Sequence, residues 1–192
     1  MAIMAVEFMP NQSSMLPLGT KALDFNLQDV VSQASVTLST LEDKKALLVM
    51  FICRHCPYVK HVQQELAKLG RDYQDKDIAI VAISANDPIS YPEDAPQSLK
   101  EQATQLNFTF PYLFDRSQEV AKAYQAVCTP DFFLFDAERK LVYRGQLDDS
   151  RPDSGIPVTG KNLRAAIEAV LNDQAVDQNQ KPSMGCSIKW KT

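Results

Sequence analysis

Two uninterrupted apolar runs of strand length, residues 46–52 and 78–83, dominate the hydrophobic pattern of the chain. An apolar run without alternation is typical of a strand covered on both faces of a sheet. Between the two runs, residues 53–73 carry apolar side chains at helical spacing, namely Val59, Val62, Leu66 and Leu69. A strand, a helix and a second strand in this order predict a right-handed crossover between parallel strands.

The pattern that follows predicts two more helices and a short strand. Residues 86–96 form a loop with three prolines. Asp94, near the end of this loop, and Gln97 have the spacing of a capping box for the helix that follows. Residues 112–114 are apolar and predict a short strand, and a further helix is expected to begin near Asp115. The middle of the chain therefore continues the alternation of strands and helices.

The last part of the body predicts a hairpin and a closing helix. Residues 132–135 and 141–144 are apolar runs joined by a short polar turn, which indicates an antiparallel pair. Residues 162–171 have the amphipathic pattern of a helix. Together, these elements predict an α/β fold with a central mixed sheet and helices on both faces.

The two ends of the chain are more polar than the body. Residues 1–19 are interpreted as an irregular N-terminal extension, and residues 173–192 as a C-terminal tail. The domain is placed at residues 16–172. Because Ile188 and Trp190 alternate with charged residues, we expect both side chains to lie on one face and to hold the tail against the domain.

Composition narrows the function classes. The 192 residues include 20 Lys and Arg against 24 Asp and Glu, a net charge of −4, which argues against a nucleic-acid or anionic-membrane partner. No apolar run approaches the roughly 20 residues that span a bilayer, and the first residues lack the positive region of a secretory signal. Four cysteines are too few for a disulfide scaffold. We therefore expect a cytoplasmic protein with reduced thiols.

The sharpest chemical feature is Cys53-Arg54-His55-Cys56-Pro57, where the first buried strand gives way to a helix. Two intervening residues bring the sulfurs within reach of a disulfide, and a helix start favours a thiolate through its free N–H groups and dipole. Arg54 and a protonated His55 are expected to strengthen that field. The position of Cys53 at the junction predicts that it attacks, while Cys56 resolves the mixed disulfide.

Two other interpretations of these cysteines are weaker. They could be two buried apolar side chains, or half of a zinc site completed by His55 or His61. Zinc sites need four ligands at suitable spacing, and the chain has no second Cys-x-x-Cys. We therefore predict no metal and no organic cofactor.

A second candidate feature is Cys128-Thr129-Pro130, directly before the predicted strand at residues 132–135. A proline cannot donate to a sheet ladder, so it marks the start of the strand or a bulge. It is either an ordinary loop proline or a cis proline that exposes the Thr129 backbone beside the thiols, where a substrate strand could pair.

These motifs resemble the thioredoxin-like superfamily, and within it the redoxin group related to alkyl hydroperoxide reductase and thiol-disulfide oxidoreductases. The match combines the Cys-x-x-Cys junction and the Thr129-Pro130 strand with residues 22–27, 55–60, 143–152 and 185–191. The resemblance implies a thioredoxin-like fold, a cis Pro130 and redox roles for Cys53 and Cys56. It also implies a disulfide-containing protein or small molecule as substrate, and a thiol reductant such as thioredoxin or glutathione.

The chain departs from its relatives in informative ways. Ile52 replaces the Trp that precedes the pair in thioredoxin, and a His before the second cysteine resembles strongly oxidising members of the superfamily. Peroxiredoxins carry Thr or Ser three residues before the peroxidatic cysteine. In this chain, Met50 stands three residues before Cys53, and Cys53 stands three residues before Cys56. Neither cysteine of the pair therefore has that hydroxyl, which weakens the peroxidase interpretation.

Three functions are compatible with these residues. The first is a thiol-disulfide oxidoreductase, the second a peroxiredoxin-like peroxidase with an antioxidant role, and the third a non-enzymatic redox sensor. The intact Cys-x-x-Cys favours the first. Cys128 and Cys186 remain accessory thiols with either a redox role or none.

Overall fold

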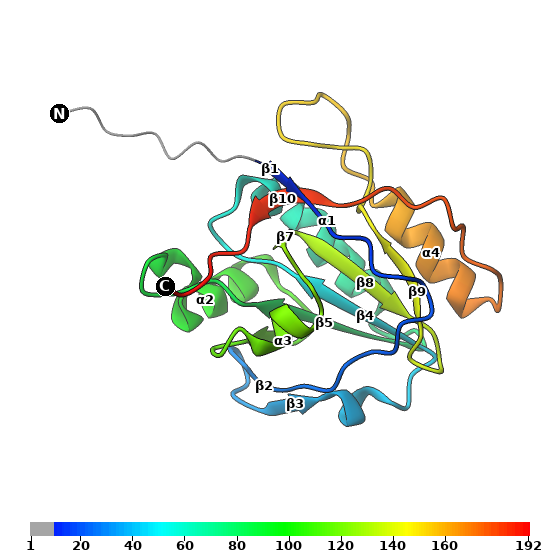
Figure 1. Cartoon of the computed structure of the whole chain (residues 1–192), viewed down its shortest axis with the longest axis horizontal. Helices are drawn as coiled ribbons and strands as arrows, with labels where there is room; N and C mark the ends of the chain where they lie inside the picture. Colours follow the sequence, from blue (N-terminus) through cyan, green and yellow to red (C-terminus); the bar gives the residue numbers. More distant parts are fainter. Residues whose placement is uncertain (1–9) are drawn as a thin grey trace.

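The computed structural model describes residues 10–192 and has the two apolar runs at the centre of a seven-stranded sheet (Figure 1). They form β4 (Ala46–Phe51) and β5 (Ile78–Ser84), which pair in parallel. The strand order is β3-β2-β6-β5-β4-β8-β9. The other members are β2 (Asn26–Asp29), β3 (Ser35–Thr37), β6 (Tyr112–Phe114), β8 (Asp131–Phe135) and β9 (Leu141–Gly145).

The sheet is mixed because strands run in both directions beside the central pair. β6 pairs with β5 in parallel, whereas β8 pairs antiparallel with β4 and then with β9 as the predicted hairpin. β2 and β3 form an antiparallel hairpin that the hydrophobic pattern did not predict, since their residues are largely exposed or half-buried. The predicted central mixed sheet is confirmed.

Helices cover both faces of this sheet. They are α1 (Pro57–Tyr73), α2 (Pro96–Leu106), α3 (Glu119–Ala123) and α4 (Lys161–Leu171), with 3-10 turns η1 (Leu38–Leu41) and η2 (Pro92–Asp94). Alternate residues of β4 face two cores: Leu48 and Met50 pack with α1, α2 and α4, while Leu47 and Val49 pack with α3 and the N-terminal segment. The α/β class is therefore confirmed.

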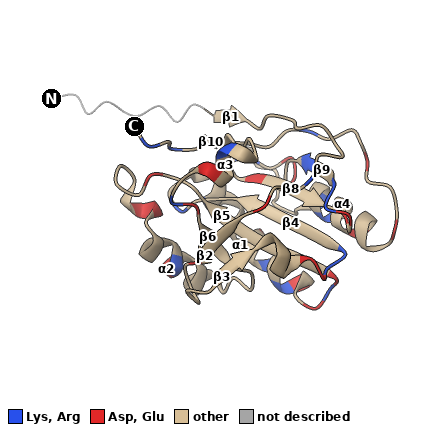
Figure 2. Cartoon of the chain, turned by 60° about the horizontal axis from the view of Figure 1, so that its bottom comes forward, with Lys and Arg blue, Asp and Glu red and all other residues tan. Residues whose placement is uncertain are grey.

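Charged residues lie mainly on the helices and loops, and the central strands β4 and β5 carry none (Figure 2). Both strands are buried along their whole length. Within residues 10–192, no helix combines the length and the apolar character that crossing a bilayer requires.

Three predicted helix starts were wrong, each for a local reason. α1 begins at Pro57 and not at Cys53, and proline is well suited to the first position of a helix because its missing N–H is not needed there. α2 has Ala95 as its N-cap, because the Asp94 side chain turns toward another loop. α3 begins at Glu119, a few residues beyond Asp115.

A second, three-stranded sheet joins the two ends of the chain, in the order β1-β10-β7 (Figure 1). β1 (Pro10–Gln12) lies within the extension that was predicted to be irregular. β10 (Met184–Ser187) belongs to the C-terminal tail and pairs antiparallel with β1 and with β7 (Cys128–Thr129). Residues 1–9 of the predicted extension lie outside the described part of the chain.

The two predicted anchors of the tail behave differently. Ile188 is buried in the core that also contains Leu47 and Val49 of β4, and its N–H donates to the Val127 carbonyl at 3.1 Å. Trp190 is 40% exposed, so its prediction as a buried anchor was wrong. The backbone on either side of it is held instead: the N–H groups of Lys189 and Lys191 donate to side-chain oxygens of the body.

Candidate active site

The Cys53–Cys56 pair lies between the end of β4 and the start of α1, and both side chains are fully buried. The Cys53 sulfur is 3.3 Å from the Thr129 hydroxyl, and the Cys56 thiol donates to the Thr129 carbonyl oxygen at 3.3 Å. The two cysteines belong to the same buried cluster. All four cysteines of the chain are free thiols. The structure therefore brings the predicted thiol pair and Thr129 together.

Asp94 holds the loop between the two cysteines. Its Oδ1 accepts the N–H of Arg54 at 2.7 Å and that of His55 at 3.1 Å. Its Oδ2 contacts the His55 Nδ1 and accepts Asn86 Nδ2 at 2.8 Å. Among the described residues, Cys53, His55 and Asp94 offer metal-ligand atoms within 4.8 Å of one another. Because both Asp94 oxygens already accept these hydrogen bonds, we assign the carboxylate to holding the loop.

Of the two residues predicted to tune the thiolate, Arg54 is engaged on α2 and His55 lies near Cys53. The Arg54 guanidinium donates to the Ser98 carbonyl at 2.8 Å and to the Glu101 carboxylate at 3.1 Å, both on α2. The His55 ring stacks on Tyr91 with centroids 5.0 Å apart, while its Nδ1 faces Asp94. These contacts direct the Arg54 side chain toward α2, whereas the His55 ring keeps a nitrogen within 4.8 Å of the Cys53 sulfur.

The two thiols have pKa shifts in opposite directions, whereas the sequence predicted the lower pKa for Cys53. Burial raises the pKa of Cys53 well above its ordinary value, helped by the hydrogen bond with Cys56 and the negative charge of Asp94. Hydrogen bonds from the thiols of Cys186 and Cys53, and from the Val59 N–H, lower the pKa of Cys56. Cys56 is the N-cap of α1, so the helix start favours its thiolate.

The Thr129-Pro130 peptide is cis, as the resemblance implied. The Thr129 backbone was expected to be open for a substrate strand, and that expectation was wrong: β10 of the same chain pairs there, with Cys186 opposite Thr129. A Cβ on Gly185 would lie only 1.9 Å from the Thr129 carbonyl oxygen. The strands can approach this closely only because position 185 has no side chain.

The two remaining cysteines lie in different surroundings. The Cys186 thiol hydrogen-bonds Cys56, which raises the pKa of Cys186, and burial raises it further. The Cys128 sulfur lies 4.0 Å from the Pro130 carbonyl oxygen, and burial together with the charge of Asp131 raises its pKa. The structure thus places Cys186, but not Cys128, in contact with the Cys-x-x-Cys pair.

The sequence interpretation missed two groups of residues near the site. Asp94 was read as a helix cap, and its true partners lie about forty positions earlier. Asp131 of β8 and Arg144 of β9 form an ion pair at 3.0 Å, with both side chains fully buried. Burial raises the pKa of Asp131 to about 6, against the lowering effect of Arg144. The available signal for this pair was the presence of one charged residue in each of two otherwise apolar strands, Asp131 at the start of β8 and Arg144 near the end of β9.

A small hollow lies beside Pro130. Its walls include Tyr58 and His61 of α1, Met184 of β10 and Arg151 of the loop after β9. It is the concave surface nearest to the cis proline among those described, and no cysteine is among its lining residues.

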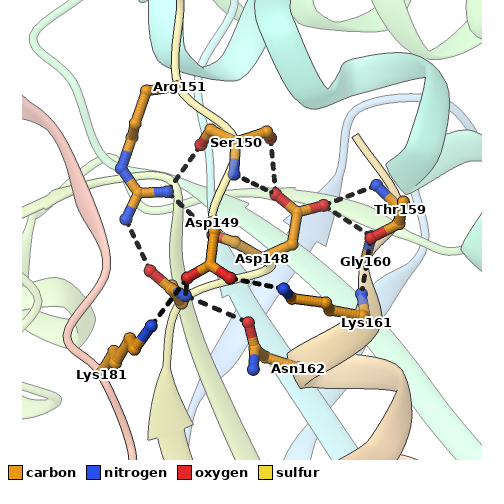
Figure 3. A network of polar contacts seen from close by, with 10 residues as sticks. Asp148, Asp149, Ser150, Arg151, Thr159, Gly160, Lys161, Asn162 and Lys181 are labelled. Atoms are coloured by element: carbon orange, nitrogen blue, oxygen red, sulfur yellow. Dashed lines mark hydrogen bonds and ion pairs between the residues drawn. The ribbon is translucent and has the colours of Figure 1, made fainter. Parts of the chain in front are cut away.

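The wall of this hollow is fixed by a polar network (Figure 3). Asp148 accepts the backbone N–H groups of Ser150, Thr159 and Gly160 at 2.9, 2.6 and 2.7 Å. Arg151 donates to the carbonyls of Asp148 and Ser150 at 2.8 and 2.6 Å. The motif at residues 143–152, which carried part of the resemblance, therefore serves to hold this loop in place.

Comparison with known proteins agrees with the fold. The chain is 25% identical over 129 residues to "Thiol-disulfide oxidoreductase ResA" of Halalkalibacterium halodurans, covering 67% of this chain and 68% of that protein. The crystal structure of an uncharacterized conserved protein from Geobacillus kaustophilus is 53% identical, with a TM-score of 0.94, covering 97% of this chain and 98% of that one.

A more distant structure identifies the fold class. The thioredoxin domain of a thiol-disulfide oxidoreductase from Bacteroides vulgatus matches with a TM-score of 0.56 at 22% identity, covering 68% of this chain and 89% of that one. The fold is therefore thioredoxin-like. The model of the AhpC/TSA family matches residues 18–144, a stretch that contains the Cys-x-x-Cys pair, the cis proline and the strands between them. With this match over most of its length, the chain belongs to the AhpC/TSA family.

Proposed function

We propose that the protein is a thiol-disulfide oxidoreductase in which Cys53 and Cys56 form the redox-active dithiol. The observation that carries the proposal is the convergence of the two buried sulfurs on Thr129, Cys53 on its hydroxyl and Cys56 on its carbonyl oxygen, each at 3.3 Å. Two thiols in contact can exchange between dithiol and disulfide without a large movement of the backbone. The name of the curated relative from Halalkalibacterium halodurans supports the same class of reaction.

Cys56 is the attacking thiol in this proposal. Its thiolate attacks one sulfur of a substrate disulfide, which forms a mixed disulfide and releases the other sulfur as a thiolate. Cys53, after losing its proton to the departing group, then attacks the Cys56 sulfur. This step forms the Cys53–Cys56 disulfide and releases the second substrate thiol. The substrate gains two electrons, and a dithiol or two monothiols return the protein to its reduced form.

A peroxidase activity is the second candidate, and the burial of the thiolate favours it. Cys56 is fully buried with a lowered pKa, so a substrate as small as hydrogen peroxide needs less opening of the structure to reach it than a protein disulfide does. Its thiolate would attack one peroxide oxygen and release water, and Cys53 would condense with the sulfenic acid to give the same disulfide. Cys53 occupies the position three residues earlier, where peroxiredoxins carry a hydroxyl.

The test compares turnover of hydroxyethyl disulfide with turnover of hydrogen peroxide, with glutathione or thioredoxin as the electron donor. The proposal predicts faster disulfide turnover, lost in Cys53→Ser and Cys56→Ser and retained in Cys128→Ala, which alters a thiol outside the pair. Faster peroxide turnover would establish the second candidate. Turnover of neither substrate would refute both and leave the redox-sensor hypothesis. The donor and a cytoplasmic location stay predictions.

A further inference from the structure

The tail strand β10 lies where a thioredoxin-like fold would receive a substrate strand. It runs antiparallel to β7, with Cys186 opposite Thr129 and Ser187 opposite Cys128. Pairing of an extended segment along an open strand edge is a common way to recognise a peptide. In this chain that edge is filled by residues of the same molecule (Figure 1).

The tail is held at this position on both sides of Cys186. Before it, Gly185 brings its backbone against Thr129 so closely that no Cβ would fit. After it, the Lys189 N–H donates to Asn86 Oδ1 at 2.8 Å, and the Lys189 carbonyl accepts Gln118 Nε2 at 2.9 Å. Two independent attachments therefore fix the segment that carries Cys186.

Cys186 presents its thiol to the pair at the place of a substrate sulfur. Its side chain is buried in the same cluster as Cys56, and it lies opposite Thr129, whose carbonyl oxygen accepts the Cys56 thiol at 3.3 Å. Cys56 therefore shares Thr129 with two other cysteines: Cys53, whose sulfur lies 3.3 Å from the Thr129 hydroxyl, and Cys186, which pairs with Thr129 from β10. A sulfur between two thiols can form a disulfide with either, provided that the geometry allows it.

We propose that β10 is a tethered occupant of the substrate-strand position and that Cys186 is a second resolving thiol for Cys56. The proposal rests on the oxidoreductase function proposed above and adds a third member to its redox site. It also explains why all three sulfurs are buried in the reduced protein: the tail covers the pair that it serves.

The chemistry of the additional step balances. After Cys56 has formed a mixed disulfide with one half of the substrate, Cys186 loses its proton to the departing thiolate and attacks the Cys56 sulfur. The Cys56–Cys186 disulfide forms and the second substrate thiol leaves. Cys53 can then attack Cys56, which gives the Cys53–Cys56 disulfide and returns Cys186 to the thiol. No oxidant beyond the substrate disulfide is required.

The test isolates Cys186 by removing Cys53. The reduced full chain carrying Cys53→Ser is treated with hydroxyethyl disulfide, and its peptides are mapped by mass spectrometry without reduction. The proposal predicts a Cys56–Cys186 linked peptide and no lasting mercaptoethanol adduct. The double variant Cys53→Ser, Cys186→Ser should instead retain one adduct on Cys56. Adding Cys128→Ala to Cys53→Ser is the matched control and should leave the linked peptide in place.

The outcomes separate this proposal from the proposed function. If Cys53→Ser keeps its adduct while wild-type protein still forms the Cys53–Cys56 disulfide, the role of Cys186 is overturned and the oxidoreductase stands. If Cys53→Ser forms the Cys56–Cys186 peptide while the wild-type protein does not turn over disulfides, the role of Cys186 stands and the function fails. If no cysteine of either protein reacts, both are overturned. Circular dichroism of each variant establishes that it is folded.

Discussion

The substitution Gly185→Ala tests whether the tail strand controls access to the thiols, because it forces β10 away from β7 without altering any cysteine. The added Cβ would meet three backbone atoms: the Thr129 oxygen at 1.9 Å, the Thr129 carbonyl carbon at 2.6 Å and the Pro130 nitrogen at 3.1 Å. None of these can rotate away as a side chain would. The two backbones must therefore separate by more than an ångström.

The magnitude follows from what this separation breaks. Overpacking of this kind costs about 1–3 kcal/mol, and loss of the Ile188 N–H bond to Val127 costs about 0.5–1.5 kcal/mol more. A total of about 1.5–4.5 kcal/mol corresponds to a shift of roughly 10- to 1,600-fold in the docking equilibrium of the tail. The fraction of molecules with an undocked tail rises by the same factor.

The assay is the rate at which iodoacetamide alkylates Cys186 in the folded protein, followed by peptide mass spectrometry. We expect a rate increase within that range for Gly185→Ala. Ser187→Ala is the matched control, because it shortens a side chain on the same strand and adds no atom, and it should stay near the wild-type rate. A wild-type alkylation rate in Gly185→Ala, with an unchanged circular dichroism spectrum, would show that the pairing of β10 with β7 does not control access to Cys186.

Three further predictions follow from the buried charges of the site. The lowered pKa of Cys56 predicts that thiolate absorbance persists at about pH 6, where a free thiol with a pKa of about 8.5 is protonated, and that Cys56→Ser abolishes it. The stability that this thiolate contributes is fully present above the unfolded-state pKa and is lost as the pH falls. In urea titrations, the difference in unfolding free energy between wild type and Cys56→Ser should therefore shrink toward acid pH. In urea titrations, Asp94→Asn should lower the unfolding free energy by about 2–3 kcal/mol. It should also lower the pKa of Cys53, because it removes a nearby negative charge. The control Glu101→Gln removes an exposed partner of Arg54 and should lower the unfolding free energy by less than about 1 kcal/mol. Arg144→Met leaves a buried carboxylate unpaired and should cost about 3–5 kcal/mol in the same titration; equal midpoints for wild type and variant would contradict this.

The central part of the fold could be predicted because its signals are local. The apolar runs of β4 and β5 and the paired runs of β8 and β9 carry their burial in consecutive residues. The Cys-x-x-Cys pair was also expected at the strand-to-helix junction, where it lies. Its helix start was misplaced by four residues, although Pro57 directly after Cys56 is a recognised signal for the first helical position.

The rest depends on contacts between distant residues, which a pattern along the chain does not contain. Asp94 accepts N–H groups from positions about forty residues away, so its spacing to Gln97 suggested a cap that does not form. The pairing of β10 with β7 joins segments more than fifty residues apart. Gly185 was the one local signal for it, since a glycine inside a strand often marks the close approach of another backbone.

The reversible Cys53–Cys56 disulfide is tested most directly by equilibrating the wild-type protein in dithiothreitol redox buffers and mapping its peptides at each potential. We expect one two-electron transition. At the most oxidising potentials, Cys53 should be linked to Cys56, and Cys128 and Cys186 should be free thiols. Cys53 and Cys56 remaining thiols across the whole range, or a disulfide that leaves out Cys56, would contradict it.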